Sequence, residues 1–587
     1  MGTEAGRGAG KRTGRAIAPI VILAVLAALL WFAGKPIIEQ YTPNQEPVDL
    51  RAYLGLSGAE DAAVFLGDDH AAANAIVRGG AVYWDADSVK RNFAGNFWWD
   101  KGEGLLLLTT ADEVVRAEAG VPSYTRHAEA APGEGVSPEI VTADAPVFLL
   151  EKGRAYISLG YALQFSNFAY ELFPDPYRVQ IYAGDGSHDA AAALKKTALH
   201  RAGDIKSGVV RELQKGETVY ILSQMKEWSK VKTRDALVGF VENRRLSESA
   251  PEEIRVPQNY APPPYTALTS DKRLCIAWHQ VSVYDANAYL YDMIEGAWPL
   301  DVISPTWYSV SDASGAVTSI ASRDYVAQAH ARGLSVWALV SDFADGLDRE
   351  ALLASTESRN TFVSYMVEQA GALGFDGINL DFELVPASSA QGFEQLLREL
   401  SVACRAHGLV FSVDNYPPRA HTEHYNRSLQ GEVADYVVVM GYDEHWGSSS
   451  GAGSVASLPF AREAIELTLD AAPANKTINA VPFYTRIWNT ARDGTVSASA
   501  VGQKTQAEWI EKRGLEPIWD ETLGQHYTQI DEQNKLYQVW LEDESSMQAR
   551  IDMMKEYGLG GVAGWRLGLE SEAFWDILGA YTREGAG

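Results

Sequence analysis

The chain has 587 residues, of which 46% are hydrophobic, and its formal net charge is -27, with 50 Lys and Arg against 77 Asp and Glu. This composition excludes a disordered chain, and the length provides for several domains. The acidic balance argues against nucleic acid as a partner, because that binding relies on Lys and Arg neutralising phosphates. With only two cysteines, Cys275 and Cys404, a disulfide framework is excluded.

The N-terminal segment joins a basic flank to an uncharged apolar run. Residues 16–34 approach the length of about 20 that a spanning helix needs and exceed the roughly 7 to 15 of a signal-peptide core. We therefore expect an uncleaved transmembrane anchor, with residues 1–15 as a cytoplasmic basic tail. A cleaved signal peptide is the alternative. The predicted location is the cell membrane, with a single pass, the N-terminus inside and the bulk of the chain outside at the cell wall.

Residues 46–185 contain a weak internal repeat, with copies that begin at Gly79 ("GGAVYWDADSV") and Lys152 ("KGRAYISLGYA"). Each copy predicts a strand, a helix and a hairpin, which makes this an α+β repeat domain. The segment loosely resembles the stalk-like repeat at the N-terminus of copper amine oxidases, a resemblance that implies no copper. We interpret the pair Trp98-Trp99 as core rather than as a platform for a sugar.

Residues 193–249 predict a small all-β barrel, because short strand-like runs alternate with turn residues at close spacing. The stretch resembles a bacterial SH3 domain, which implies a module of a kind that often binds cell-wall peptides. Trp228 is then either a binding residue or part of the core. Residues 250–270 are rich in proline and are expected to form a semi-rigid linker.

The C-terminal part, residues 271–587, alternates strand-like and helical patterns. This alternation predicts an α/β fold, a (β/α)8 TIM barrel. A longer gap before the last strand predicts an insertion at about 489–536. The eight strand-like runs begin near residues 274, 302, 334, 377, 409, 436, 478 and 561.

The run "GINLDFE" at residues 377–383 alternates large apolar residues with acids and an amide. In a barrel the apolar set faces the helices, so Asn379, Asp381 and Glu383 form a file on the inner side. Glu383 then stands at the C-terminal end of its strand, where such barrels carry their chemistry. An exposed antiparallel strand with a wet face is the alternative, but it does not explain the neighbouring pattern of strands and helices.

Three motifs carry a resemblance to glycoside hydrolase family 18, the chitinases and their relatives. They are Asp376-Gly377-x-Asn379-x-Asp381-x-Glu383, Met440-Gly441-Tyr442-Asp443, and Trp565 at the end of the last strand, with "PFYTR" at 482–486 beside them. Asn379 departs from the family, where chitinases usually have Asp. Asn there is similar to the spore-cortex and wall-lytic branch, which points to peptidoglycan before chitin.

The resemblance implies a substrate-assisted, retaining hydrolysis of β-1,4 bonds in glycans that contain N-acetylglucosamine. Glu383 protonates the leaving oxygen and later activates water. Asp381 orients the acetamido N–H of the substrate, and Tyr442 donates a hydrogen bond to the acetamido oxygen, which attacks the anomeric carbon. We also expect the Asn379 amide to donate to Asp381, which favours the ionised form of Asp381 and lowers its pKa.

The remaining candidates are expected around the sugar. Trp565 is interpreted as a sugar platform and Asp443 as a partner of the distorted ring. The other candidate substrate-binding residues are Asn379, Tyr484, Arg486, Trp278, Trp307 and Trp446, the last five being either subsites or packing. Neither His279 nor His445 has a metal-ligand partner at a suitable spacing, so no metal and no cofactor is expected.

The partners predicted from these residues are peptidoglycan or a chitin-like polysaccharide, and the cytoplasmic membrane through the N-terminal helix. Two alternatives stay open. One is a chitinase or an endo-β-N-acetylglucosaminidase that releases N-glycans. The other is a catalytically weak wall protein that binds glycans, although the presence of Glu383 disfavours it.

Overall fold

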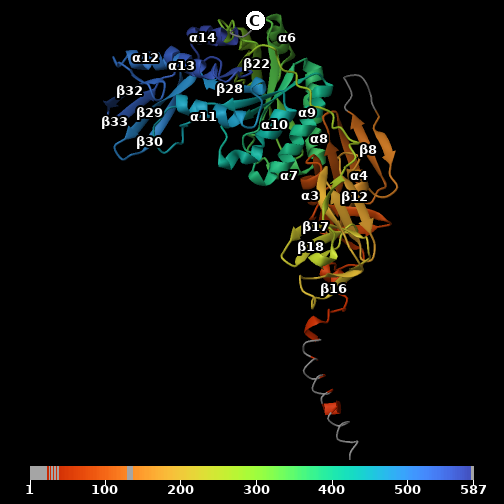
Figure 1. Cartoon of the computed structure of the whole chain (residues 1–587). Helices are drawn as coiled ribbons and strands as arrows, with labels where there is room; N and C mark the ends of the chain where they lie inside the picture. Colours follow the sequence, from red (N-terminus) through yellow and green to blue (C-terminus); the bar gives the residue numbers. More distant parts are fainter. Residues whose placement is uncertain are drawn as a thin grey trace, which may run out of the picture. The chain divides into compact units, whose positions relative to one another are not determined.

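The computed structural model describes residues 39–128 and 137–583, together with positions 23–25, 27, 31 and 35. The chain forms two compact units. The first comprises Met1–Phe93 and Tyr156–Tyr260, and the second comprises Ala94–Ala155 and Ala261–Gly587. The units therefore interleave along the sequence, as the colours of Figure 1 allow the reader to follow.

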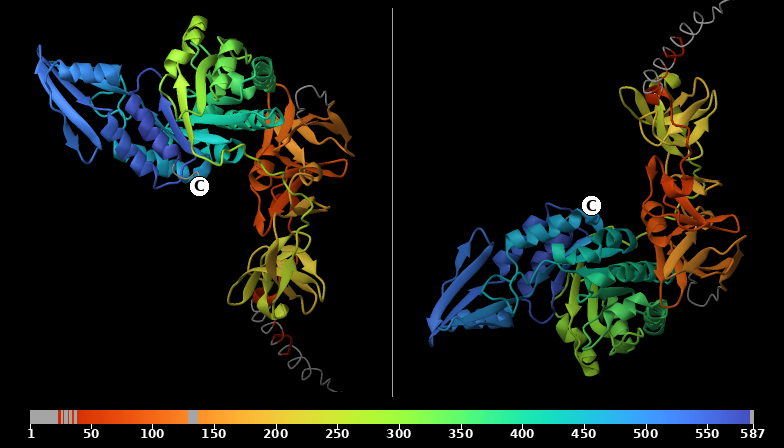
Figure 2. Two further views of the ribbon diagram at one scale, coloured as in Figure 1. Left: turned by 90° about the horizontal axis from the view of Figure 1, so that it is seen from above. Right: turned by 90° about the horizontal axis from the view of Figure 1, so that it is seen from below.

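A closed barrel of eight parallel strands forms the centre of the second unit (Figures 1 and 2). The ring closes because β21 pairs with β22 on one side and with β34 on the other. The predicted TIM barrel is thus confirmed. Its strands are β21 (Leu274–His279), β22 (Val302–Val310), β24 (Ser335–Ser341), β25 (Gly377–Asp381), β26 (Val410–Asn415), β27 (Tyr436–Met440), β28 (Thr477–Pro482) and β34 (Gly561–Trp565).

Helices cover the outside of this ring, and the period of two along each strand decides what faces them. In β25, Ile378 and Leu380 lie in the apolar core between strands and helices, whereas Asn379 and Asp381 face the barrel interior. The main helices are α6 (Arg323–Ala331), α8 (Thr356–Leu373), α9 (Ala390–Ala406), α10 (Arg427–Val433), α11 (Leu458–Leu469), α13 (Glu544–Met554) and α14 (Glu572–Arg583).

A second sheet is inserted between β28 and α13. Its strand order is β30-β29-β33-β32-β31, and the helix α12 (Gln503–Glu511) crosses from β30 to β31. The predicted insertion, about 489–536, lies within this segment, which begins earlier because β29 follows β28 almost directly. The strands are β29 (Tyr484–Ala491), β30 (Val496–Gly502), β31 (Ile518–Asp520), β32 (Gln525–Glu532) and β33 (Lys535–Trp540).

An antiparallel sheet from residues 94–155 packs against the barrel helices α8 and α9. Thr356, the first residue of α8, donates from its backbone N–H (2.7 Å) and its hydroxyl (2.8 Å) to Asp100. The Arg359 guanidinium lies 5.2 Å from the ring centre of Trp98, so this tryptophan takes part in packing. The strands are β5 (Phe97–Asp100), β6 (Leu105–Thr109), β7 (Glu113–Glu118), β8 (Ser123–Ala128) and β9 (Glu139–Thr142).

The first unit contains two sheets. One includes the strands β11-β4-β3-β1-β13-β12 in that order, with the short helices α3 (Ala86–Asn92) and α4 (Leu159–Ala162). Its strands are β1 (Asp61–Leu66), β3 (Ala75–Arg78), β4 (Ala81–Asp85), β11 (Arg154–Ser158), β12 (Ala169–Phe173) and β13 (Arg178–Tyr182). Each copy of the sequence repeat contains a strand, a helix and a hairpin: β4, α3 and β5–β6 in the first, β11, α4 and β12–β13 in the second.

The other sheet of the first unit has seven strands in the order β16-β15-β19-β18-β17-β14-β20. All its pairings are antiparallel, and it contains the segment predicted to be SH3-like. The resemblances to an SH3 domain and to the copper amine oxidase stalk stay predictions. The strands are β14 (Gly186–Ala192), β15 (Thr197–His200), β16 (Val209–Leu213), β17 (Thr218–Gln224), β18 (Trp228–Thr233), β19 (Val238–Glu242) and β20 (Ala250–Ile254).

The predicted location in the membrane is contradicted. A bilayer span needs a helix of about 20 apolar residues, and among the described residues no helix combines the length and the apolarity required. Most of the predicted anchor, residues 16–34, lies outside the described residues. We therefore retain neither the membrane location nor the membrane as a partner.

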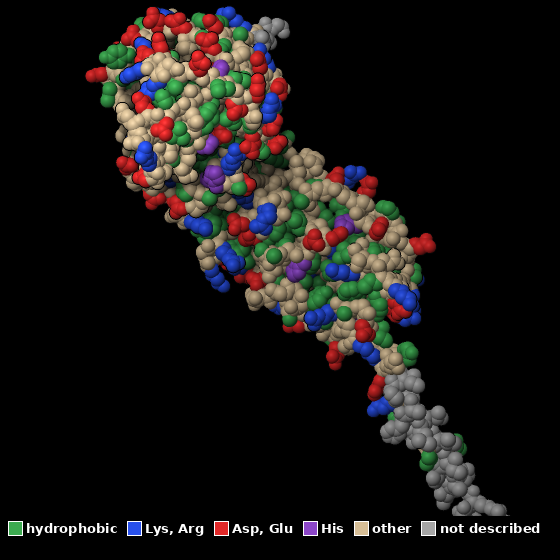
Figure 3. All heavy atoms as spheres, turned by 90° about the vertical axis from the view of Figure 1, so that its left-hand side faces the viewer, with side chains coloured by type: hydrophobic (Ala, Val, Ile, Leu, Met, Phe, Trp, Pro, Cys, Tyr) green, Lys and Arg blue, Asp and Glu red, His purple; other side chains and the backbone are tan. Residues whose placement is uncertain are grey.

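The surface charge follows the composition. On the face drawn in Figure 3, acidic side chains are spread among basic ones and do not gather into a single patch. Such a mixed surface favours solubility. The net charge of -27 therefore does not indicate a binding site for a charged partner on that face.

Candidate active site

A cavity of about 240 Å³ opens at the C-terminal ends of the barrel strands. Strands β21, β24, β25, β26, β27 and β34, or the loops that follow them, each contribute to its wall. The lining residues are Trp278, Leu339, Phe343, Asp381, Glu383, Asp414, Tyr416, Met440, Tyr442, Asp443 and Trp565. The barrel thus brings acids and aromatic rings together at the edge where such folds carry chemistry.

Asp381 and Glu383 form the acidic centre of this cavity. Burial, followed by the charges of Glu383, Asp414 and Asp342, raises the pKa of Asp381 well above its usual range. Burial also raises the pKa of Glu383, although a hydrogen bond from Tyr416 opposes the shift. A raised pKa lets a carboxyl group keep its proton to higher pH, which favours a role as general acid.

The backbone at Glu383 is held from the neighbouring strand. Asp342, which follows β24, accepts from the N–H groups of Glu383 (3.0 Å) and Leu384 (3.1 Å). Its other partner is Arg349, at 2.8 Å. Because Asp342 is fully buried and paired, it fixes the point where the chain leaves β25. The glutamate side chain is positioned as a result.

Tyr442 and Asp443 follow β27 on another side of the cavity. Burial raises the pKa of Tyr442 well above its usual value, so its hydroxyl stays a donor. Asp443 accepts from the Tyr484 hydroxyl at 2.6 Å and from Arg486 at 3.0 Å. Both partners lie on β29, so the inserted sheet orients Asp443. Of these four predicted residues, Tyr442 and Asp443 line the cavity, and the other two hold Asp443.

Asn379 does not hold Asp381, which corrects the expectation from the sequence. Its Oδ1 accepts from Trp278 Nε1 (2.9 Å) and Ser304 Oγ (3.0 Å), and its Nδ2 donates to Ser412 Oγ (3.1 Å) and Asp414 Oδ1 (2.8 Å). All four of these side-chain bonds therefore run to other strands of the barrel, β21, β22 and β26. The predicted lowering of the Asp381 pKa is wrong as well, because burial and nearby carboxylates raise it.

The candidate tryptophans fall into three settings. Trp278 and Trp565 line the cavity, with ring centres 5.9 Å apart in an edge-on contact. Trp307 lies in the core between strands and helices, where its Nε1 donates to Asn287. It faces the helices because it shares strand parity with Ile303, so a role in substrate binding is corrected. Trp446 is 56% exposed and lies outside the cavity lining.

Sequence reasoning missed Asp414 and Tyr416. In the run "FSVDNY", polar residues at 412, 414 and 416 recur at a period of two, as they do at 379, 381 and 383. The register pairs Asn379 with Ser412, so the two polar files lie side by side. That pattern was the available signal. Among the described residues, no group of His, Cys, Asp or Glu is placed to hold a metal ion.

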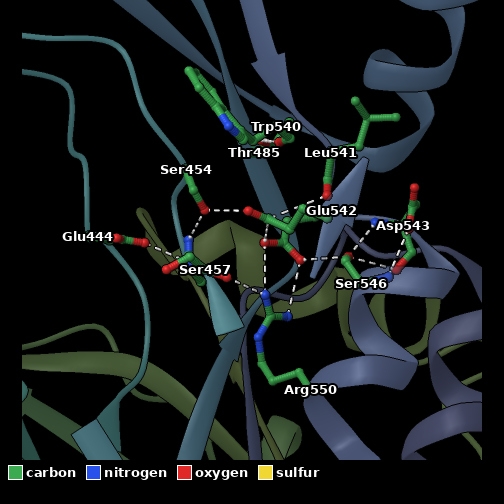
Figure 4. Close-up of polar contacts among 12 residues, drawn as sticks. Glu444, Ser454, Ser457, Thr485, Trp540, Leu541, Glu542, Asp543, Ser546 and Arg550 are labelled. Atoms are coloured by element: carbon green, nitrogen blue, oxygen red, sulfur yellow. Dashed lines mark hydrogen bonds and ion pairs between the residues drawn. The ribbon is translucent and has the colours of Figure 1, made fainter. Parts of the chain in front are cut away.

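A buried ion pair ties the inserted sheet to the loop that carries Asp443 (Figure 4). Arg550 of α13 binds both oxygens of Glu542, at 3.0 and 3.1 Å, and also donates to the carbonyl of Ala456 at 2.7 Å. Gln525 of β32 links Glu542 to Ser454. The loop between β27 and α11 is therefore braced from the insertion.

Sequence comparisons relate part of the chain to known proteins. Residues 345–570 match the sequence model of glycosyl hydrolases family 18. The uncharacterized glycosylase YvbX of Bacillus subtilis (strain 168) is 27% identical over 286 residues, which cover 45% of this chain and 80% of that protein. The cortical fragment-lytic enzyme of the same organism is 30% identical over 245 residues, 40% of this chain and 56% of that protein.

Chitotriosidase-1 of Mus musculus is 24% identical over 269 residues, which cover 40% of this chain and 57% of that protein. The chain thus spans little more than half the length of the cortical fragment-lytic enzyme and of the chitotriosidase. It contains a family 18 glycosyl hydrolase domain with homology to spore cortex-lytic enzymes and to chitinases. The matched domain is that of a glycosyl hydrolase.

Proposed function

We propose that the chain hydrolyses β-1,4 bonds next to N-acetylglucosamine, with peptidoglycan as the substrate. The observation that carries this proposal is the cavity at the strand ends, where Glu383, with its raised pKa, stands beside Asp381 and Tyr442. The relative that is named for lysis of cortical fragments supports a wall glycan. Asn379, which is similar to the wall-lytic branch, supports it as well.

The proposed chemistry is substrate-assisted and retains the anomeric configuration. Glu383 gives its proton to the leaving oxygen while the acetamido oxygen of the substrate attacks the anomeric carbon, so that an oxazolinium ion forms. Asp381 orients the acetamido N–H and offsets the positive charge, and Tyr442 donates to the acetamido oxygen. Glu383 then removes a proton from a water molecule, which attacks the anomeric carbon and opens the oxazolinium ring.

Substrate contacts follow from the same cavity. Trp565 provides a flat apolar face for the sugar at the scissile bond, and Trp278 closes the floor next to it. Asp443, held by Tyr484 and Arg486, is placed to accept from a sugar hydroxyl. Trp446, exposed on the loop after β27, offers a ring further along the glycan.

The test is the digestion of purified peptidoglycan, with mass analysis of the new reducing ends. Ends that are N-acetylglucosamine support the proposal, and ends that are N-acetylmuramic acid contradict the bond assignment. Chemically de-N-acetylated peptidoglycan is the matched control. Because the acetamido group is the nucleophile, the control should be inert. Equal release of fragments from both substrates would exclude the substrate-assisted route.

We also propose that the seven-stranded sheet of the first unit is an SH3-like module that binds the wall. Trp228 lines a cavity of about 560 Å³ there, together with Lys196, Arg211 and Arg245. Trp228→Ala should lower retention on insoluble sacculi and leave turnover of soluble oligomers unchanged. A substitution is preferable to removal of residues 1–260, because residues 94–155 pack against the barrel helices. Equal sedimentation with sacculi would contradict the module's role.

A further inference from the structure

Asp414 is a buried carboxylate that the proposed mechanism does not use. It lines the cavity from β26 and is 2% exposed. Its hydrogen-bond partner is neutral, because the Asn379 amide donates to it at 2.8 Å. Among the described residues Asp414 forms no ion pair with a cation, whereas Arg349 binds Asp342 and Arg486 binds Asp443. A buried carboxylate without a cation is costly to ionise.

The Asn379 amide is fixed in the orientation that serves Asp414. An indole N–H can only donate, so the atom that faces Trp278 must be the amide oxygen. The amide nitrogen then faces Asp414 and Ser412. Asn379 cannot take up or lose a proton itself. It is therefore a neutral connector between strands β25 and β26, and the ionisable group stands on β26.

Asp381, two residues after Asn379 in β25, lines the same cavity as Asp414. Its Oδ1 is buried without a hydrogen-bond partner, and its carboxyl group is hydrogen-bonded to that of Glu383. Two carboxyl groups can share a hydrogen bond only if a proton lies between them. The charge of Asp414 adds to that of the pair, because it is among the causes that raise the pKa of Asp381.

We propose that Asp414 is a positioning residue of this site, whose carboxylate sets how much negative charge Asp381 and Glu383 carry. When Asp414 ionises, both neighbours hold their proton more tightly, so the acid form of Glu383 persists to higher pH. The inference rests on the proposed function for its kinetic test, but it has a second test that needs no substrate. The titratable groups that face Asp414 are Asp342, Asp381, Glu383, Tyr416, Tyr442 and Asp443.

The kinetic test compares pH profiles of kcat/KM on a soluble N-acetylglucosamine oligomer. Asp414→Asn removes the negative charge that Asp414 gains when it ionises, so the alkaline limb should move down by about one pH unit, about tenfold in kcat/KM on that limb. Asn379→Asp adds a charge and should move the limb up. The double variant Asn379→Asp/Asp414→Asn moves the carboxylate from β26 to β25. Its alkaline limb should return towards that of the wild type.

Ser412→Ala is the matched control, because it removes one bond of Asn379 and no charge. The alkaline limb of its kcat/KM profile should stay at the pH of the wild type, even if the size of kcat/KM changes. An Asp414→Asn variant whose loss of rate is the same at every pH has lost only structure, and that result overturns the proposal. Superimposed profiles of wild type and Asp414→Asn overturn it equally.

The test without substrate uses the pH dependence of Tm. Burial, opposed by the Asn379 hydrogen bond, raises the pKa of Asp414 from 3.8 to about 8. A raised pKa in the folded state means that wild type loses stability as pH rises from about 4 to about 8. Asp414→Asn should therefore gain in Tm over wild type across that window and not below pH 4. A difference in Tm that is constant with pH overturns the proposal, even if no substrate is ever found.

Discussion

Two clusters of buried charge in the second unit differ in how far their charges are matched. In the cluster of Figure 4, Arg550 binds both oxygens of Glu542, and Gln525 and Ser546 supply further donors. In the cavity cluster, Asp381 has a buried oxygen without a partner, and its nearest charged neighbours are other carboxylates. The first cluster pairs its carboxylate with a guanidinium, and the second holds carboxyl groups together without one.

This difference in pairing indicates which of the two clusters has a chemical role. A matched pair such as Glu542–Arg550 braces the insertion and the loop behind Asp443, and its geometry explains its presence. The unmatched carboxylates destabilise the folded chain, and a task that needs raised pKa values explains their presence. Four substitutions test this difference between the clusters.

The largest effect is expected from Arg550→Met, because it leaves Glu542 buried and unpaired. Loss of one partner of a buried pair costs about 3 to 5 kcal/mol. Urea unfolding of the wild type and the variant measures this cost. In the double variant Glu542→Gln/Arg550→Met the stranded charge is gone, so most of the stability should return. An unchanged urea midpoint for Arg550→Met alone would show that the pair does not brace the insertion.

Glu383→Gln keeps the shape of the acid and removes its proton. Hydrolysis of N-acetylglucosamine oligomers should fall by at least ~10²-fold, the lower scale for loss of an acid–base group. Oligomer binding, measured by calorimetry, should persist. Turnover close to that of the wild type would refute the assignment of Glu383 as the acid.

Asp100→Asn tests a third and weaker interaction, the one between the Asp100 carboxylate and the start of α8. Asp100 accepts from Thr356 at the start of α8, and although burial raises its pKa, these hydrogen bonds outweigh burial and lower it overall. A lowered pKa contributes stability above pH 3.8 that is lost as pH falls through the folded value. We expect a loss of about 1 kcal/mol at pH 7 that becomes smaller as the pH falls below 3.8. A loss that is equal above and below pH 3.8 would point to shape and not charge.

Asp381→Asn is expected to have the smallest effect on stability, in the opposite direction. The raised pKa of Asp381 means that the folded state is penalised above pH 3.8, where the unfolded carboxyl ionises freely. The variant should therefore match wild type near pH 3 and melt at an equal or higher temperature at pH 7. A clear loss of Tm at pH 7 would mean that Asp381 supports the fold, and the contrast with Arg550 would fail.

The barrel and the file of Asn379, Asp381 and Glu383 were predictable because strand periodicity is local and the motif falls on one strand. The direction of the Asn379 amide was not, since Trp278 and Asp414 reach it from strands about 100 and 35 residues away. The sequence leaves Trp307 open between a subsite and packing, and its place in the core depends on β22 running on to Val310, well beyond the start of its apolar run. The bracing of Asp443 by Arg486 depended on an inserted sheet whose packing no periodicity reveals.

The interleaving of the two units sets an order of events during synthesis. The sheet that carries Trp98 and Asp100 leaves the ribosome first, but its packing partners in α8 and α9 are complete only at residue 406. At about 5 to 20 residues per second, the roughly 250 residues between them take roughly 10 to 50 s. For that interval the face of this sheet has no helix to cover it. The side chains that contact α8 in the folded chain, Trp98 and Asp100 among them, therefore stay uncovered while the barrel is being made.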